Sequence, residues 1–237
     1  MNILEQFENR GYIILDTDLP TTTIDLAAAD TIDIIENGKY SDINFGAVIS
    51  NRCQDAWKVS PHIKNISLNE KILDVVSALY GNKKVKPFQT LNFIKGTQQP
   101  VHSDAVHFNS KPSGLMCGVW VALEDVTMDN GPLVYYPGTH KKPDFLMETF
   151  NLPRKVQYYP KYEYSLSKWI EEQQLVPEYG IMKKGQMLIW ASNILHGGSP
   201  IKNQKSTRLS QVTHCYIEGA IPWRPFTGMT FQPQYIR

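Results

Sequence analysis

Two histidines and an aspartate lie close together in the segment PVHSDAVHFNS, which spans residues 100–110. In an extended strand the side chains alternate between two faces, so His102 and Asp104 would point the same way and their ligand atoms can converge on one ion. His107 lies five residues after His102, so a continuous strand would turn it to the opposite face. Alone, this spacing also fits an ordinary hydrogen-bonded or solvated histidine, and a metal site needs a further ligand from elsewhere.

A second segment, GQMLIWASNILHGGSPIKNQKSTRLS at 185–210, supplies such a ligand. It contains a β-rich run that ends in His196, then two glycines and, later, Arg208. Two histidines and one carboxylate can occupy one face of an octahedron and leave three positions open, which is the arrangement of non-haem Fe(II) oxygenases. Three open positions suit a bidentate 2-oxo acid and dioxygen. The expected metal ligands are therefore His102, Asp104 and His196.

A metal site of this kind also suggests a role for Arg208. A planar guanidinium binds a carboxylate through two parallel hydrogen bonds, so Arg208 can hold the far carboxylate of 2-oxoglutarate. Ser210, two residues further along, would share the same strand face and add a hydroxyl donor. The alternative is an arginine on a solvated strand that pairs with any acid, and the presence of His196 in the same segment weakens that alternative.

The bulk composition is that of a folded globular protein, with 237 residues of which 42% are hydrophobic and 20% charged. Lys plus Arg number 24 against 23 for Asp plus Glu, so no wide field of one sign is available to bind nucleic acid. The N-terminus is charged where a secretory signal would be apolar, and no segment approaches about 20 apolar residues. We therefore expect no membrane partner and a cytoplasmic location. Cys53, Cys117 and Cys215 are odd in number and far apart, which indicates free thiols.

Helices are predicted mainly in the first third of the chain. Residues 67–81 begin with Ser67 and Glu70 in capping-box spacing and carry an apolar helical stripe. Weaker patterns predict two more helices, at 22–37 and at 163–174.

From residue 85 the sequence changes to short β-rich runs separated by segments rich in Gly, Pro, Asn and Ser. The runs are FQTLNFI, MCGVWVALEDV, PLVYYPG, QMLIWA and LSQVTHCYI. We therefore expect a mainly β protein with added helices, in which a barrel or sandwich at 85–237 packs against a helical N-terminal part at 1–84. The whole chain, 1–237, is expected to form one domain with an irregular insert around 141–180.

Taken together, these segments resemble the phytanoyl-CoA dioxygenase family of Fe(II)/2-oxoglutarate oxygenases. The resemblance includes the opening FENRGYIIL, the approach FQTLNFIKGTQQPVHSD and the closing KKGQMLIWASNILHGGSP. Its most specific part is the long central match CGVWVALEDVTMDNGPLVYYPGTHK. The resemblance implies a double-stranded β-helix core, which is a jelly-roll or cupin-like fold, with added helices. It also implies a dioxygenase that uses Fe(II), 2-oxoglutarate and O2.

The resemblance further implies roles for single residues. Iron would be bound by the two histidines and the aspartate named above, which form the catalytic centre, and 2-oxoglutarate would be bound by Arg208. Trp120 falls where relatives have a tryptophan that lines the cosubstrate pocket. Asn92 is similar to a polar cosubstrate contact of some relatives, and Gln89 is a looser suggestion of the same kind.

Asp104 bears on the type of reaction, because related halogenases lack this carboxylate and leave its position for chloride. Its presence favours hydroxylation, or a desaturation or ring closure, of a small-molecule substrate. His107 and Phe108 are expected to line the substrate pocket, with capping of a loop as the alternative for His107. The irregular segments 105–115 and 141–180 flank the proposed site and are expected to select the substrate.

Two other histidines, His140 and His214, are expected to be structural, because one follows a tight turn and the other lies in a β-run. No cluster of basic residues suits the phosphates of coenzyme A, so a free small polar metabolite or natural-product intermediate is the expected substrate. Two other functions stay open. One is a non-catalytic metal-binding or ligand-sensing jelly roll, in which Arg208 would have no task. The other is an iron oxygenase of the same fold that does not use 2-oxoglutarate.

Overall fold

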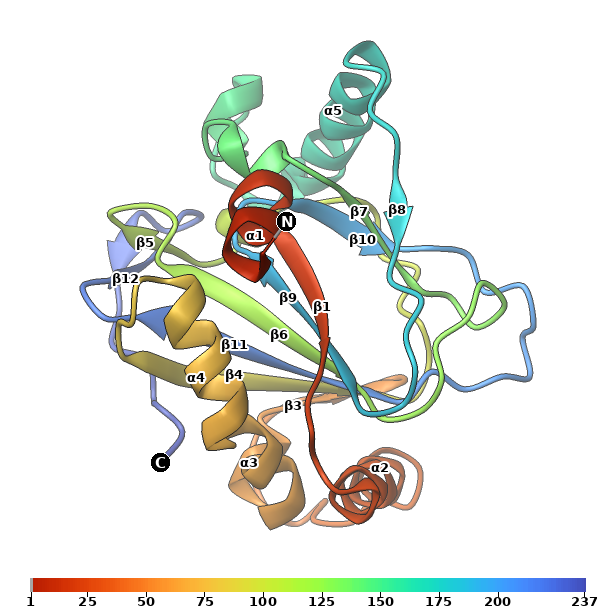
Figure 1. The fold of residues 1–237 in the computed structure, drawn as a ribbon. Coiled ribbons are helices and arrows are strands. Elements are labelled where there is room, and N and C mark those ends of the chain that lie inside the picture. Colours follow the sequence, from red (N-terminus) through yellow and green to blue (C-terminus); the bar gives the residue numbers. More distant parts are fainter. Residues whose placement is uncertain (1) are drawn as a thin grey trace.

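Seven antiparallel strands form the largest sheet of the molecule, in the order β1-β9-β6-β11-β4-β3-β2 (Figure 1). A computed structural model describes residues 2–237 of the chain. The bounds of these strands are β1 Tyr12–Asp16, β2 Val48–Ile49, β3 Arg52–Gln54, β4 Val85–Phe93, β6 Met116–Ala122, β9 Gln186–Ala191 and β11 Ser210–Ile217.

Two smaller sheets, β10-β7-β8 and β13-β12-β5, complete the β structure. Their strands are β5 Asn109–Lys111, β7 Leu133–Tyr136, β8 Glu178–Tyr179, β10 Leu195–Gly198, β12 Ile221–Arg224 and β13 Met229–Thr230. A cavity separates the large sheet from the β10-β7-β8 sheet, since Trp120 and Val212 line it on one side and Leu133 and His196 on the other. The architecture is the mainly β jelly roll expected from the sequence, in an open form that is not closed into a barrel.

Helices cover the outer face of the large sheet, as Figure 1 shows for α2, α3 and α4. The helices are α1 Ile3–Arg10, α2 Thr21–Ile35, α3 Pro61–Ser67, α4 Glu70–Leu79 and α5 Tyr159–Glu172. Short 3-10 turns are η1 Ala56–Lys58, η2 Asp104–Val106, η3 Thr139–Lys141, η4 Met147–Phe150 and η5 Val156–Tyr158. The helices predicted at 22–37 and 163–174 are confirmed as α2 and α5. Within residues 2–237, no helix combines the length and the apolar character that crossing a bilayer requires.

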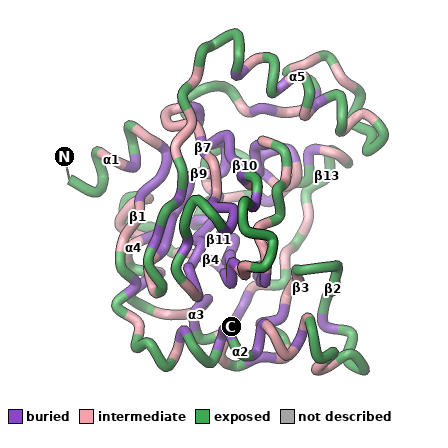
Figure 2. Tube along the Cα trace, turned by 90° about the vertical axis from the view of Figure 1, so that its right-hand side faces the viewer, coloured by how far each residue is buried: buried purple, intermediate pink, exposed green. Residues whose placement is uncertain are grey.

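The main hydrophobic core lies between the large sheet and helices α2, α3 and α4. Side chains such as Val119, Ile189 and Cys215 point outward from alternate strand positions and pack with Ile63 and Val76 of the helices. Figure 2 shows the central strands as buried, whereas the covering helices expose their outer sides. The three cysteines are buried free thiols, as the sequence indicated.

The helix predicted at 67–81 is confirmed as α4, which starts three residues later than predicted, and the predicted capping box is wrong. Ser67 is the last residue of α3, and its hydroxyl lies 3.0 Å from Thr213 Oγ1 of the large sheet. Asn69 is the N-cap of α4, so Glu70 begins this helix without a reciprocal bond to Ser67. Ser67 therefore contacts a distant strand, and Asn69 caps the helix in its place.

The N-terminal part is less purely helical than predicted. Strands β1, β2 and β3 all come from the first 84 residues and join the large sheet. Along β1 the pairing with β9 runs from Tyr12 opposite Trp190 to Asp16 opposite Gln186. The division at residue 84 is therefore wrong as a boundary between helical and β structure, because the sheet needs strands from both sides of it.

Candidate metal centre

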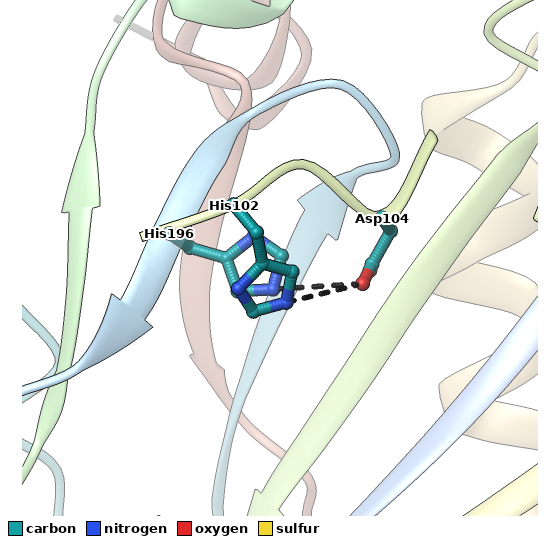
Figure 3. A group of neighbouring side chains, drawn as sticks. All are labelled: His102, Asp104 and His196. Carbon is teal, nitrogen blue, oxygen red and sulfur yellow. Dashed lines mark ion pairs between the residues drawn. The ribbon is translucent and has the colours of Figure 1, made fainter. Parts of the chain in front are cut away.

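Three side chains converge between the two facing sheets (Figure 3). The ligand atoms of His102, Asp104 and His196 all lie within 4.8 Å of one another, and all three residues are buried. The Nε2 atoms of His102 and His196 lie 3.9 and 3.7 Å from Asp104 Oδ1. The structure thus brings together the three residues that the sequence singled out, two from one segment and one from another.

The local backbone differs from the expected strand. His102 and His196 form an isolated antiparallel bridge with backbone N–H to carbonyl distances of 2.8 and 2.9 Å. The chain then turns into η2, in which Asp104 is the first residue and Ser103 is the N-cap. The alternation of a strand therefore does not explain why His102 and Asp104 converge, and a bridge followed by a 3-10 turn does.

Each histidine is oriented by a main-chain carbonyl. His102 Nδ1 lies 2.9 Å from the oxygen of Pro100, and His196 Nδ1 lies 3.0 Å from the oxygen of Ile194. An Nδ1–H that donates to a carbonyl leaves the Nε2 lone pair free, which is how metal-ligating histidines are held. Both Nε2 atoms therefore face the third ligand in the form that binds a metal.

Protonation states also suit a metal. Burial and the neighbouring His196 lower the pKa of His102 to about 3, so the imidazole is neutral at pH 7. Burial would raise the pKa of the Asp104 carboxyl, but His196, His214 and His102 together outweigh burial and lower it. A neutral imidazole and an ionised carboxylate are the forms that metal binding requires.

The second oxygen of the carboxylate has its own partners, which the sequence interpretation missed. Asp104 Oδ2 accepts a hydrogen bond of 2.8 Å from Trp190 Nε1 and lies 3.7 Å from His214 Nε2. His214, which was expected to be structural, lines the cavity beside this carboxylate. The spacing of four positions between Ser210 and His214 along β11 places their side chains on the same face of the strand.

Arg208 lies in the same cavity and is 3% exposed. Its Nη1 donates to Ser210 Oγ at 3.0 Å, and its guanidinium carbon lies 5.0 Å from the ring centroid of Trp120. Its Nε has no hydrogen-bond partner in the described part of the chain. Burial lowers the pKa of Arg208 to about 10, so the guanidinium stays charged at neutral pH.

The two amide side chains suggested as cosubstrate contacts behave differently. Gln89 lines the cavity. Asn92 is fully buried on the opposite face of β4, where its Nδ2 donates to Thr31 Oγ1 of α2 at 3.1 Å and to Gln211 Oε1 at 3.4 Å. The expectation that Asn92 contacts the cosubstrate is wrong, because Asn92 lies three positions after Gln89 along the strand and an odd spacing puts the two side chains on opposite faces.

His107 and Phe108 both line the cavity. The 3-10 turn brings His107 back to the metal side, with its ring centroid 5.9 Å from that of His102. His107 Nε2 lies 2.9 Å from Tyr159 Oη, which links the cavity to α5 of the insert. The Phe108 ring lies 4.9 Å from that of His214.

The cavity has a volume of about 580 Å³, within the range that holds small-molecule ligands. Two further arginines, Arg52 and Arg224, line it together with Phe226 and Thr227. Among the lining residues that the structure describes, Asp104 is the only acid. The charge around the cavity is therefore mainly positive away from the carboxylate.

Comparison with known sequences finds a family match over most of the chain. The family model of phytanoyl-CoA dioxygenase (PhyH) matches residues 7–209. Human peroxisomal phytanoyl-CoA dioxygenase is 30% identical over 115 residues, which are 46% of this chain and 31% of the human protein. A probable phytanoyl-CoA dioxygenase of Caenorhabditis elegans is 33% identical over 106 residues, 41% of this chain and 31% of that protein. The matched part thus spans about a third of the length of these relatives.

Solved structures share the fold across nearly the whole chain. The non-haem α-ketoglutarate-dependent carbocyclase SnoK from nogalamycin biosynthesis superimposes with a TM-score of 0.75 at 15% identity, covering 98% of this chain and 93% of SnoK. EctD from S. alaskensis with 2-oxoglutarate and 5-hydroxyectoine gives a TM-score of 0.72 at 17% identity, with 99% and 85% covered. The identities are low, so these likenesses establish the jelly-roll fold alone.

Proposed function

Because the chain belongs to the phytanoyl-CoA dioxygenase family, we propose that it is an Fe(II)- and 2-oxoglutarate-dependent dioxygenase. The reaction hydroxylates, or otherwise oxidises, an unactivated C–H bond of a small-molecule metabolite and releases succinate and CO2. One observation carries the proposal: a single cavity contains both a buried His-Asp-His triad and a buried arginine, Arg208.

The triad fits Fe(II) in donor type and in geometry. Two imidazole nitrogens and one carboxylate oxygen form the set that leaves three coordination positions open. The 3.7 and 3.9 Å separations between the nitrogens of His196 and His102 and the oxygen of Asp104 are too long for hydrogen bonds, as expected of groups that converge on an ion between them. With 2-oxoglutarate and O2 bound, the iron supplies the oxidising chemistry, and the protein supplies binding and orientation.

Arg208 fits the far carboxylate of 2-oxoglutarate. Its charge is buried beside Trp120 and Phe93, at 5.0 and 5.7 Å from their ring centroids, where an unpaired cation is costly. A carboxylate that accepts from the guanidinium and from Ser210 Oγ would remove that cost. The solved EctD complex contains 2-oxoglutarate on the same fold, which supports this use of the cavity.

The remaining cavity wall favours a substrate with an acidic group and an apolar body. Arg224 lines the cavity and lies over the Phe231 ring at 4.6 Å, and Phe108 and Phe226 supply apolar surface nearby. His107 is held by Tyr159 and, because burial lowers its pKa, adds no positive charge at neutral pH. A carboxylated or phosphorylated small molecule suits this wall better than a cationic one does.

The proposal extends to the whole chain and its location. Residues 1–237 act as one oxygenase domain in which strands of the N-terminal part complete the sheet and the 141–180 insert, with α5, borders the substrate end. A cytoplasmic location stays a prediction from the sequence, and several relatives carry the name peroxisomal. Fractionation of cells that express the tagged protein tests the location directly.

An anaerobic titration of the apoprotein with Fe(II) and then 2-oxoglutarate tests the function. A visible charge-transfer band should appear when the oxo acid chelates the iron, and it should be lost in Asp104→Ala and in Arg208→Ala. Fe(II) binding without a band would favour an iron oxygenase that does not use 2-oxoglutarate. The absence of metal binding would instead favour a jelly roll that senses a ligand without catalysis.

With the band established, succinate release identifies the substrate. Acids should stimulate release more than the matching amides, and Arg224→Gln should reduce that preference. Equal stimulation by acids and amides would contradict the proposed acidic group.

A further inference from the structure

The two oxygens of Asp104 have different surroundings. Oδ1 is the oxygen near the nitrogens of His102 and His196, at 3.9 and 3.7 Å. Oδ2 instead accepts the 2.8 Å hydrogen bond from Trp190 Nε1 and lies 3.7 Å from His214 Nε2. One oxygen is therefore free for an ion, and the other is held by residues of the large sheet.

Strand register places these supports in one row of the sheet. Gly118 of β6 lies opposite Trp190 of β9 on one side and opposite His214 of β11 on the other. A Cβ at Gly118 would lie 2.3 Å from the indole Cε2 and Cζ2 atoms of Trp190. The indole therefore occupies space that any other residue at position 118 would fill, and this lets its N–H reach Asp104.

We propose that Trp190, lying over Gly118, is a positioning residue that holds Asp104 Oδ2 so that only Oδ1 binds the metal, with His214 as a second support. This inference rests on the proposed function. A carboxylate bound through one oxygen leaves three coordination positions, whereas a carboxylate free to rotate can bind through both oxygens and occupy a position needed for 2-oxoglutarate or O2. Partners of this kind tune metal affinity without touching the metal.

Trp190→Phe tests the proposal, because it keeps an aromatic ring and removes the N–H donor. Co(II) serves as the probe, since it is stable in air and the intensity of its visible d–d bands depends on coordination number. We expect the Co(II) affinity of Trp190→Phe to fall about 10–100-fold, as for other partners of metal ligands. We also expect its d–d spectrum to change, which a loss of packing alone would not cause. Unchanged affinity and spectrum would overturn the proposal.

The chain offers a matched control in Trp57, whose indole Nε1 donates to Asp55 Oδ1 at 3.3 Å away from the cavity. Trp57→Phe also removes an indole-to-aspartate hydrogen bond, and it should leave Co(II) affinity and spectrum unchanged. An equal loss of affinity in both variants would overturn the proposal, because the effect would then come from general destabilisation.

Gly118→Ala supplies a second variant that keeps the indole N–H. The added methyl group displaces the ring, so Co(II) affinity should fall and the spectrum should change in the same direction as in Trp190→Phe. Wild-type Co(II) affinity in a folded Gly118→Ala variant would show that the position of the Trp190 indole over Gly118 is not needed for metal binding. It would overturn the proposed arrangement.

His196→Ala separates this inference from the proposed function. If wild-type protein binds Co(II) through the triad, the His196→Ala variant loses it, and Trp190→Phe then tests positioning alone. If wild-type binding does not depend on His196, the metal centre itself fails, and with it the reason for holding Asp104.

Discussion

The two faces of the large sheet use the same strands for opposite purposes. On the outer face, Val119 and Ile189 pack against the helices as part of an apolar core. One residue further along the same strands, Trp120 and Trp190 face the cavity together with His214. The period of two in a strand keeps the two sets apart, so a single sheet separates a stabilising face from a binding face.

The inner face contains buried polar atoms that lack hydrogen-bond partners. Nε of Arg208 and Nδ1 of His214 are buried without hydrogen-bond partners in the part of the chain that the structure describes. An unsatisfied buried polar group costs about 1–3 kcal/mol, so this face is retained at a cost to folding. Because the inner face lines the cavity and the outer face forms the apolar core, substitutions on the inner face should affect ligands more than stability, and substitutions on the outer face should do the reverse.

His196→Ala gives the largest expected effect on the inner face. Loss of a direct ligand should weaken Fe(II) binding by more than the about 10–100-fold typical of groups that only support a ligand. The thermal midpoint of the apoprotein should change little, because the Nδ1 contact to Ile194 is the main hydrogen bond that the ring makes. Anaerobic Fe(II) titration and thermal unfolding measure the two quantities. Full iron occupancy in the variant would remove His196 from the ligand set.

Ile189→Ala makes the opposite test on the outer face. Ile189 is fully buried against the helices, and truncation of such a side chain costs about 2–5 kcal/mol in the free energy of unfolding. Urea denaturation measures that loss, and Fe(II) affinity below the transition should stay within about twofold of wild type. A large loss of Fe(II) affinity in the folded variant would show that the two faces are coupled.

The chemistry of the site was predictable from sequence because it depends on residue types. Two histidines, a carboxylate and an arginine on separate β-rich segments suggested one site, and His102, His196 and Arg208 line one cavity. The same is true of the broad fold, since the β-rich runs from residue 85 onward contain most strands of the large sheet. Local patterns suffice where a residue's role follows from its own chemistry or from its strand.

The predictions that were wrong concern features that depend on contacts between distant segments of the chain. Ser67 and Asn69 are both good helix-capping residues, but Ser67 ends α3 and contacts Thr213, whereas Asn69 caps α4. His214 reaches Asp104 only because β11 lies beside β6 and β9 in a particular register, which no local pattern contains. The convergence of His102 and Asp104 was predicted for the wrong reason, since a 3-10 turn and not a strand produces it.

Arg208→Met tests the comparison of the two faces, because it should increase the stability of the apoprotein while it removes a ligand-binding group. The substitution removes a buried charge and keeps a long side chain, so the apoprotein should become more stable by about 1 kcal/mol or more. Protection by 2-oxoglutarate against thermal unfolding should be lost. Arg10→Met is the control, because Arg10 has an acidic partner in Glu178 and its removal should not stabilise the protein. Destabilisation by Arg208→Met would mean that the guanidinium is a structural group.

Asn92→Ala has the smallest expected effect and tests the comparison on a single strand. Asn92 lies between Leu91 and Phe93, which line the cavity, yet its side chain bonds to Thr31 on the helix side. Loss of that bond should cost about 1 kcal/mol in unfolding free energy and leave 2-oxoglutarate affinity within about twofold. Gln89→Ala, on the cavity face of β4, is the matched variant in which ligand affinity should respond instead. A fall of more than about tenfold in 2-oxoglutarate affinity for folded Asn92→Ala would contradict the assignment of faces, because one strand cannot turn neighbouring residues to the same side.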